Sequence, residues 1–162
     1  MLRATKSKKL RSKGARFAIV ASQYNARYVD AMLRAAKAEL TRAGAKNVQV
    51  IRVPGAYEIP VVAARLARSH GIPNTEHATP FALICLGVIL RGETTHAAHI
   101  GEAVSLALMQ IQLQWGVPVI HEVLLLENEE QARVRCLGKK HNRGSEAAQT
   151  ALAMAKVIAR YG

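Results

Sequence analysis

The sequence predicts a single α/β domain arranged in three layers. Short apolar runs alternate with longer segments of helical periodicity along the chain, which implies parallel strands joined by right-handed helical crossovers. The central run, Phe81 to Leu86, is apolar without interruption, as expected for a strand buried on both faces of a parallel sheet. These observations favour an α/β/α flavodoxin-like fold with a mainly parallel four-stranded sheet. Residues 1–15 are expected to form a basic arm and residues 16–162 the domain.

The first half of the chain is expected to supply two strands and two helices. Apolar residues recur at helical spacing from Val29 to Leu40, and Gly44 is expected to end that helix. Pro60 suits the first turn of the second helix. In order, the expected elements are a strand at 16–21, a loop at 22–25, the first helix, a strand at 47–53, a turn at 54–56, a helix at 58–69 and a surface loop at 70–80.

The second half begins with the central strand, which Gly87 is expected to end. The helix expected at 97–115 has apolar residues on two sides. One side can face the sheet, whereas the other, with Leu106, Met109 and Leu113, needs a partner such as another subunit. The remaining expected elements are a strand at 117–126, a helix at 127–137, a basic turn at 138–144 and a last helix at 145–160.

The net charge of +12 is concentrated at the N-terminus. Of the 23 Lys and Arg residues, seven lie in the first 16 positions, where there is no acid, and the remaining 16 exceed the 11 acidic residues by only five. This segment could bind nucleic acid or another polyanion, or it could be a solvated arm that orders on assembly. We favour the arm, because no interleaved aromatics or base-reading motif accompany the charges.

The composition points to the cytoplasm. Cys85 and Cys136 have neither disulfide-framework nor metal-type spacing, which is typical of a reducing compartment. No apolar run approaches the roughly 20 residues of a membrane span. The basic N-terminus is not followed by an apolar core, so we do not expect a secretory signal.

The strongest chemical signal is the junction that follows the central strand. The chain leaves the strand, crosses a polar loop, Arg91 to Thr95, and enters a helix at His96. In open α/β sheets ligands bind at the carboxyl ends of the strands, and a helix N-terminus there suits an anion such as phosphate. A histidine beside that anion is a candidate acid or base near neutral pH. On position alone, a local hydrogen bond at the helix start explains His96 equally well.

Other candidate residues are weak when taken singly. Glu58 is explained as an ordinary first-turn acid of a helix, and Arg135 and Arg143 as parts of a solvated basic surface. The three histidines outside this junction that could suggest a metal, His99, His121 and His141, match no common ligand spacing. There is no glycine-rich dinucleotide or Walker loop and no nucleophile elbow, so nucleotide cofactors and serine or cysteine nucleophiles lack support.

Taken together, four segments resemble the motifs of 6,7-dimethyl-8-ribityllumazine synthase, the penultimate enzyme of riboflavin biosynthesis. They are VPGAYEIP at 53–60, GETTH at 92–96, GVPVI at 116–120 and NRG at 142–144. The resemblance runs from about Arg16 to the C-terminus. It implies a transferase that condenses 5-amino-6-(D-ribitylamino)uracil with 3,4-dihydroxy-2-butanone 4-phosphate, releases phosphate and water, and needs no cofactor and no metal.

The resemblance also implies which positions bind and which react. His96 matches the family's proton-transfer residue and Arg135 its phosphate-binding arginine. The other positions placed against the substrates are the stacking aromatic Tyr24, the ribityl-binding segment Ala56, Tyr57 and Glu58, the strand end Val88, Ile89 and Leu90, the phosphate turn Glu93 and Thr94, and finally His121 and Arg143.

Three features differ from the family's usual pattern. His96 is followed by Ala97-Ala98-His99, where aromatic and acidic residues are common; His121 stands where an aromatic is frequent, and Arg143 where lysine is usual. The alternative hypothesis is therefore a weakly active or inactive homologue that binds a flavin or pteridine or serves as a scaffold. We favour the enzyme because His96, Arg135 and Glu58 are present.

The resemblance further implies a homo-oligomer. Members of the family assemble as pentamers with active sites between neighbouring subunits, and some form decamers or hollow shells of sixty subunits. The expected partners are therefore two small-molecule substrates, one of them a sugar phosphate, and further copies of the chain. We expect no membrane contact and do not favour nucleic acid.

Overall fold

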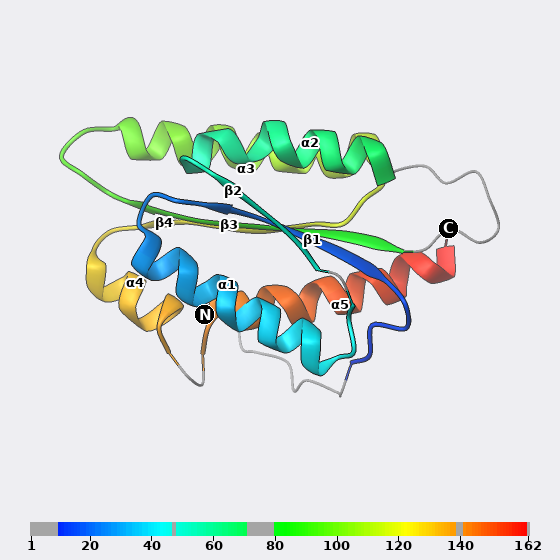
Figure 1. Ribbon diagram of the computed structural model, residues 1–162. Helices are drawn as coiled ribbons and strands as arrows, with labels where there is room; N and C mark the ends of the chain where they lie inside the picture. Colours follow the sequence, from blue (N-terminus) through cyan, green and yellow to red (C-terminus); the bar gives the residue numbers. More distant parts are fainter. Residues whose placement is uncertain (1–9, 47, 71–79, 139–140, 162) are drawn as a thin grey trace.

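The computed structural model describes residues 10–46, 48–70, 80–138 and 141–161. Residues 71–79 of the predicted loop at 70–80 and residues 1–9 of the predicted arm lie outside these ranges. The described strands form one sheet of order β2-β1-β3-β4 in which every pairing is parallel (Figure 1). They are β1 (Arg16–Ser22), β2 (Gln49–Val53), β3 (Phe81–Leu90) and β4 (Val119–Leu126). The prediction of a parallel four-stranded sheet is confirmed.

The described helices form two layers, one on each face of this sheet. α2 and α3 cover one face, and α1, α4 and α5 cover the other (Figure 1). The helices are α1 (Ala26–Arg42), the short 3-10 helix η1 (Ala56–Glu58), α2 (Ile59–His70), α3 (His96–Trp115), α4 (Glu129–Cys136) and α5 (Arg143–Tyr161). The three-layer prediction is therefore confirmed. None of the helices in the described ranges has the length and apolarity that a membrane span requires.

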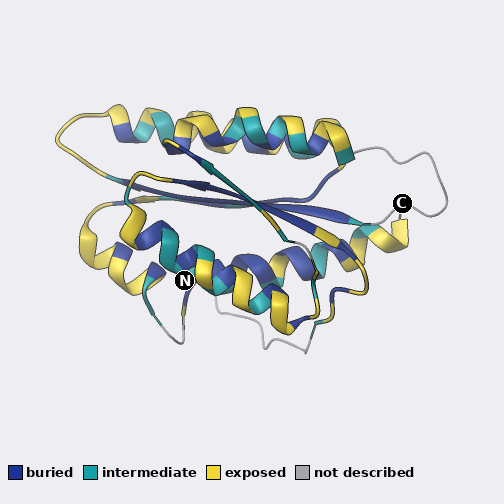
Figure 2. Ribbon diagram, in the orientation of Figure 1, coloured by how far each residue is buried: buried dark blue, intermediate teal, exposed yellow. Residues whose placement is uncertain are grey.

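The core consists of two apolar clusters separated by the sheet. In β1, Phe17 and Ile19 belong to the cluster with α1, α4 and α5, whereas Ala18 and Val20 belong to the cluster with α2 and α3. This alternation follows from the two-residue period of a strand. Figure 2 shows the buried strands between helices whose outer surfaces are exposed. The all-apolar central run is explained in the same way, because both of its faces are covered.

Gly87 does not end the central strand, contrary to the prediction. β3 continues to Leu90, and Gly87 pairs in register with Val123 of β4. A Cβ atom on Gly87 would lie 3.0 Å from Cγ1 of Val123 and 3.4 Å from Cδ1 of Ile59. The glycine is therefore required by close packing of neighbouring side chains within the strand, and not by a turn.

The last helix begins earlier than predicted, at Arg143 rather than at residue 145. Asn142 fixes this start: its Oδ1 accepts from the N–H of Gly144 at 2.9 Å, and its main-chain O accepts from Oγ of Ser145 at 2.8 Å. Gly144 lies in the first turn, where a Cβ atom would fall 2.0 Å from the main-chain O of Met32 in α1. The glycine that indicated a turn instead allows α5 to pack closely against α1.

The outer side of α3 carries an apolar surface. Val104, Leu108 and Ile111 are buried against the sheet, but three large apolar side chains on the other side are between 52% and 75% exposed. These residues, Leu106, Met109 and Leu113, are called the α3 stripe below. The prediction that this helix is apolar on two sides is confirmed, and one of these sides is uncovered in the single chain.

Candidate active site

Two loops meet at the carboxyl edge of the sheet, where β1 and β2 end. The N–H of Gln23 donates to the main-chain O of Val53 at 2.8 Å, and the N–H of Tyr24 donates to that of Pro54 at 3.0 Å. The loop after β1 is therefore held against the end of β2 by main-chain hydrogen bonds. This places Tyr24 beside the segment 54–58.

Gly55 is the contact point between these loops. The Oε2 of Glu58 accepts from the N–H of Gly55 at 2.9 Å. A Cβ atom at Gly55 would lie 2.8 Å from that oxygen and 3.1 Å from Cδ2 of Tyr24, so the Tyr24 ring packs directly on the turn. The ring is 73% exposed, which leaves an aromatic surface open to a planar ligand. The Glu58 carboxylate closes its own turn, as its interpretation as a first-turn acid predicts.

Asn25 connects the same loop to the end of β3. Its Nδ2 donates to the main-chain O of Val88 at 2.7 Å, and its own backbone is left-handed with φ of 55°. From the sequence, Asn25 was predicted to lie in the loop, without a role of its own. One available signal was its residue type, because asparagine adopts the left-handed conformation more readily than most residues.

The end of β3 offers main-chain groups rather than side chains. Val88 and Ile89 are buried, and Leu90 is half-buried. The N–H of Arg91 donates to the main-chain O of Leu126 at 2.8 Å, so residue 91 faces β4. Because successive residues of a strand alternate in direction, the main-chain groups of Val88 and Leu90 face the side of β1. Asn25 already binds the Val88 carbonyl on that side. The main-chain N–H and C=O of Leu90 are therefore the groups at the end of β3 that face the loops.

The loop between β3 and α3 is exposed and leads directly into the helix start. Glu93, Thr94 and His96 are all exposed, and His96 is the first residue of α3. Thr95 occupies the N-cap position, but its side chain makes no capping hydrogen bond. The first N–H groups of α3 are therefore not capped by this residue, and together with the helix dipole they can attract an anion.

Two of the other predicted site residues, His121 and Arg143, lie away from this edge on the same chain. His121 pairs with Cys85 near the start of β4, five residues before Leu126. At about 3.3 Å per residue this places it about 16 Å from the strand's carboxyl end. Arg143 contacts Glu122, the next residue of β4. The structure thus joins the Tyr24 loop, the 54–58 turn and the end of β3 by hydrogen bonds, with residues 93–96 following β3, and it places His121 and Arg143 elsewhere.

His121 faces α3 and is oriented by a serine. The Oγ of Ser105 donates to the main-chain O of Gly101 at 2.7 Å and lies 2.9 Å from Nε2 of His121. With the Ser105 hydroxyl donating to Gly101, the Nε2–H tautomer of His121 is the form that can donate to Oγ.

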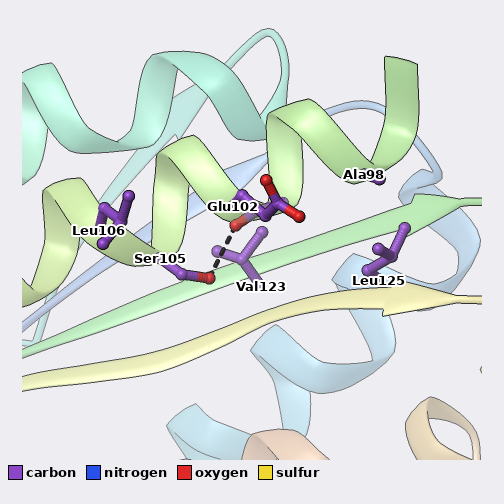
Figure 3. A pocket seen from close by; sticks show the side chains of 7 residues that line it. Ala98, Glu102, Ser105, Leu106, Val123 and Leu125 are labelled. Atoms are coloured by element: carbon purple, nitrogen blue, oxygen red, sulfur yellow. Dashed lines mark hydrogen bonds between the residues drawn. The ribbon is translucent and has the colours of Figure 1, made fainter. Parts of the chain in front are cut away.

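A surface hollow of about 610 Å³ lies beside this pair, between α3 and β4 (Figure 3). Its lining includes Glu102 and Leu106 from α3 and Val123 and Leu125 from β4. None of the predicted substrate-binding residues lines it. The hollow adjoins the α3 stripe through Leu106 and is separate from the loops of the carboxyl edge.

Arg143 lies in a small cluster of charges on the opposite face of the sheet. Its Nε donates to Oε2 of Glu122 at 3.0 Å, and its Nη1 donates to Oε2 of Glu146 at 2.8 Å. Glu122 is only 7% exposed. Burial raises the pKa of Glu122 to about 7, while the charge and hydrogen bond of Arg143, and the charge of Arg135, act to lower it. Arg135 is exposed on the last turn of α4.

No group of three metal-binding side chains occurs among the residues that the structure describes. The carboxyl edge presents an exposed aromatic ring, main-chain groups, a helix start and a histidine, and the two predicted arginines lie on α4 and α5 of the same chain. This donor set suits a planar heterocycle and an anion.

The fold and these loops define a class: an α/β protein of the flavodoxin-like kind, whose candidate site lies at the carboxyl ends of its parallel strands. A family model described as 6,7-dimethyl-8-ribityllumazine synthase matches residues 14–159. The protein of that name from Stenotrophomonas maltophilia (strain R551-3) is 44% identical over 146 residues, covering 89% of each chain. The one from Xanthomonas oryzae pv. oryzae (strain PXO99A) is 42% identical over 153 residues, covering 92% of this chain and 93% of the relative. The chain belongs to the 6,7-dimethyl-8-ribityllumazine synthase family, which confirms the resemblance drawn from the motifs.

Proposed function

We propose that the chain condenses 5-amino-6-(D-ribitylamino)uracil with 3,4-dihydroxy-2-butanone 4-phosphate to form 6,7-dimethyl-8-ribityllumazine, the penultimate step of riboflavin biosynthesis. The chain is thus a transferase, in agreement with its family. One observation carries the proposal at the level of the site: the Tyr24 loop, the 54–58 turn and the end of β3 are far apart in sequence but are joined by hydrogen bonds at one edge.

The pyrimidine substrate binds against Tyr24 and the loops beside it. The exposed ring supplies a stacking surface, and the main chain of Leu90 supplies donors and acceptors for the edge of the heterocycle. The segment of Ala56, Tyr57 and Glu58 lies next to this ring and holds the ribityl chain. Substrate binding here would also order two reactants against each other, which removes much of the entropic barrier to their condensation.

The phosphate of the second substrate binds at the start of α3. The uncapped N–H groups there and the polar turn of Glu93 and Thr94 suit a dianion. Condensation requires attack of an amine on a carbonyl to form an imine, elimination of phosphate, and ring closure. His96, exposed at the first position of α3, is the group that moves protons in these steps.

Arg135, Arg143 and His121 act from a neighbouring subunit. Two observations support this part of the proposal. On one chain His121 lies about 16 Å from the carboxyl edge, and the α3 stripe is an exposed apolar surface of the kind that oligomers bury. A pentamer, alone or as the unit of a decamer or a 60-subunit shell, completes the site. A cytoplasmic location remains a prediction.

The assay is formation of lumazine from the two substrates, followed by absorbance and corrected for the spontaneous reaction. We expect turnover well above that background and a loss of about 10²-fold in His96→Ala, since a general acid or base typically contributes at least this factor. His99→Ala is the matched control, because His99 is also exposed in the first turn of α3, and should retain activity. Background rates from a folded wild-type oligomer would instead support the binding or scaffold hypothesis.

A further inference from the structure

Glu122 is a buried carboxylate to which the motifs of the family assign no role. It lies on β4, paired with Leu86 of β3, and its residue is 7% exposed. Placing a carboxylate in such a position is costly unless a specific partner compensates. The partner is Arg143, whose Nε donates to Oε2 of Glu122 at 3.0 Å.

Arg143 is held from two directions. Glu122 binds Nε from the sheet, and Glu146 binds Nη1 at 2.8 Å from one helical turn further along α5. The third nitrogen, Nη2, makes no hydrogen bond to any residue in the described ranges. The Arg143 side chain is 35% exposed, so this nitrogen remains available to an anionic or polar ligand.

The two anchors differ in rigidity. Glu146 is on the same helix as Arg143, three residues away, and its side chain is 32% exposed. Glu122 projects from a strand paired along its length with β3, so its carboxylate is fixed relative to the sheet. Among the described residues, Glu122 is the anchor that ties the Arg143 side chain to an element other than its own helix.

We propose that Glu122 is a positioning residue that holds the guanidinium of Arg143 so that its remaining N–H groups meet the substrate. The inference rests on the proposed function, because the role of Arg143 in substrate binding does. Glu122 itself does not touch the substrate and acts through Arg143. The required feature is an acceptor oxygen at this point of β4, not the negative charge.

The first test is a set of four variants assayed for lumazine formation: Glu122→Gln, Glu122→Met, Arg143→Ala and the Glu122→Met/Arg143→Ala double variant. Methionine has similar length but no oxygen. Arg143 keeps Glu146 as a partner and its side chain is 35% exposed, so this change does not leave the arginine charge buried and unpaired. We expect Glu122→Met to raise KM for one of the two substrates about tenfold, within the range for coupled neighbours, with kcat changed less. Glu122→Gln keeps an acceptor oxygen and should stay within about threefold of wild type.

The coupling between the Glu122 and Arg143 substitutions distinguishes a positioning role of Glu122 from a general effect on stability. If Glu122 acts only through Arg143, the double variant should be no worse than Arg143→Ala alone. Equal losses from Glu122→Met with and without Arg143 would overturn the proposal. Glu130→Ala is the control, because Glu130 also pairs with an arginine, Arg133, but on the exposed surface of α4, and it should leave the kinetics unchanged.

Crystal structures of the wild-type and Glu122→Met oligomers provide a test that does not depend on turnover. We expect the Arg143 guanidinium to move away from its wild-type place in Glu122→Met and to remain in Glu122→Gln. An unmoved guanidinium would overturn the positioning role even if lumazine formation is robust. If the wild type forms no lumazine above background, the proposed function fails, and these structures still decide the role of Glu122.

Discussion

The side-chain amide of Asn25 binds the main-chain carbonyl of Val88, 63 positions later in the sequence, with 2.7 Å between nitrogen and oxygen. This hydrogen bond links the loop after β1 to the end of β3, and it forms with Asn25 in a left-handed conformation. The loop that carries Tyr24 is therefore held both to β2, by main-chain bonds, and to β3, by this amide.

Two substitutions of Asn25 distinguish the contribution of its hydrogen bond to stability from the contribution of its left-handed backbone conformation. Asn25→Ala removes the donor and puts alanine, which tolerates the left-handed conformation less well than asparagine, at positive φ, so we expect the free energy of unfolding to fall by about 2–4 kcal/mol. Asn25→Gly loses the same donor but accepts the left-handed backbone, so its loss should be about 1 kcal/mol smaller. Urea unfolding at one protomer concentration measures both. Equal losses would show that the backbone conformation contributes nothing.

The alternation of strands and helices was predictable because the buried strands are apolar throughout. The run at 81–86 has no polar residue, and only a strand covered on both faces requires this. The Asn25–Val88 bond was not predictable, because it depends on which strands are neighbours and on where each ends. The carboxyl-edge site was predicted from the order strand, loop, helix, but the contacts between its segments depend on the sheet order β2-β1-β3-β4.

The glycines show the limit of local signals most clearly. In sequence, Gly87 and Gly144 indicate a strand end and a turn. In the structure, each lies inside an element at a point where a neighbour approaches closely. Similarly, the register that puts His121 near the start of β4 separates it from His96, although the motifs alone treat both as members of one site.

The packing at Gly87 makes a stability prediction with a matched control. Gly87→Ala would bring a Cβ atom to 3.0 Å from the Val123 side chain within a paired strand. Overpacking of this kind typically costs about 1–3 kcal/mol. Gly92→Ala makes the same chemical change in open space, with no atom within 4 Å, and should alter stability by less than about 0.5 kcal/mol. Thermal unfolding of the two variants compares them directly, and similar melting temperatures would contradict the role given to Gly87.

The α3 stripe makes a prediction about assembly. A double substitution, Leu106→Glu and Leu113→Glu, places two charges on the exposed apolar side of α3, and burying them in an interface is unfavourable. We expect sedimentation velocity to show smaller species than for wild type at the same concentration, with circular dichroism unchanged. Val157→Glu, at an exposed apolar position of α5, is the control. An oligomer unaffected by the double substitution would exclude the stripe from the interface.

Loss of the oligomer should also remove activity if the site is shared. In the double variant the loops of the carboxyl edge remain intact on each chain, but Arg135 and Arg143 are no longer supplied by a neighbour. Lumazine formation should therefore fall together with the fraction of oligomer as the protein is diluted. Full activity from a monomer would show that one chain holds a complete site, and it would contradict the proposed role of the neighbour.

Glu122 should make the stability of the folded chain depend on pH. Its pKa is raised from 4.5 to about 7 in the folded chain, chiefly by burial, so between these values the folded state binds more protons than the unfolded state. The free energy of unfolding must then fall as the pH rises from about 4.5 to 7. At about 1.4 kcal/mol per pKa unit, the full effect is about 3 kcal/mol.

Glu122→Gln isolates this contribution, because the six histidines and the other carboxyl groups titrate in both proteins. The difference in unfolding free energy, wild type minus Glu122→Gln, should decrease by about 2–3 kcal/mol between pH 4.5 and 7.5 and be constant above that range. Arg143, Arg135 and Glu146 are the charged groups that act on Glu122. A difference that instead increases with pH would mean that attraction to the two arginines outweighs burial. The Glu122 carboxylate would then be a stabilising ion, and its charge, as well as its oxygen, would hold Arg143.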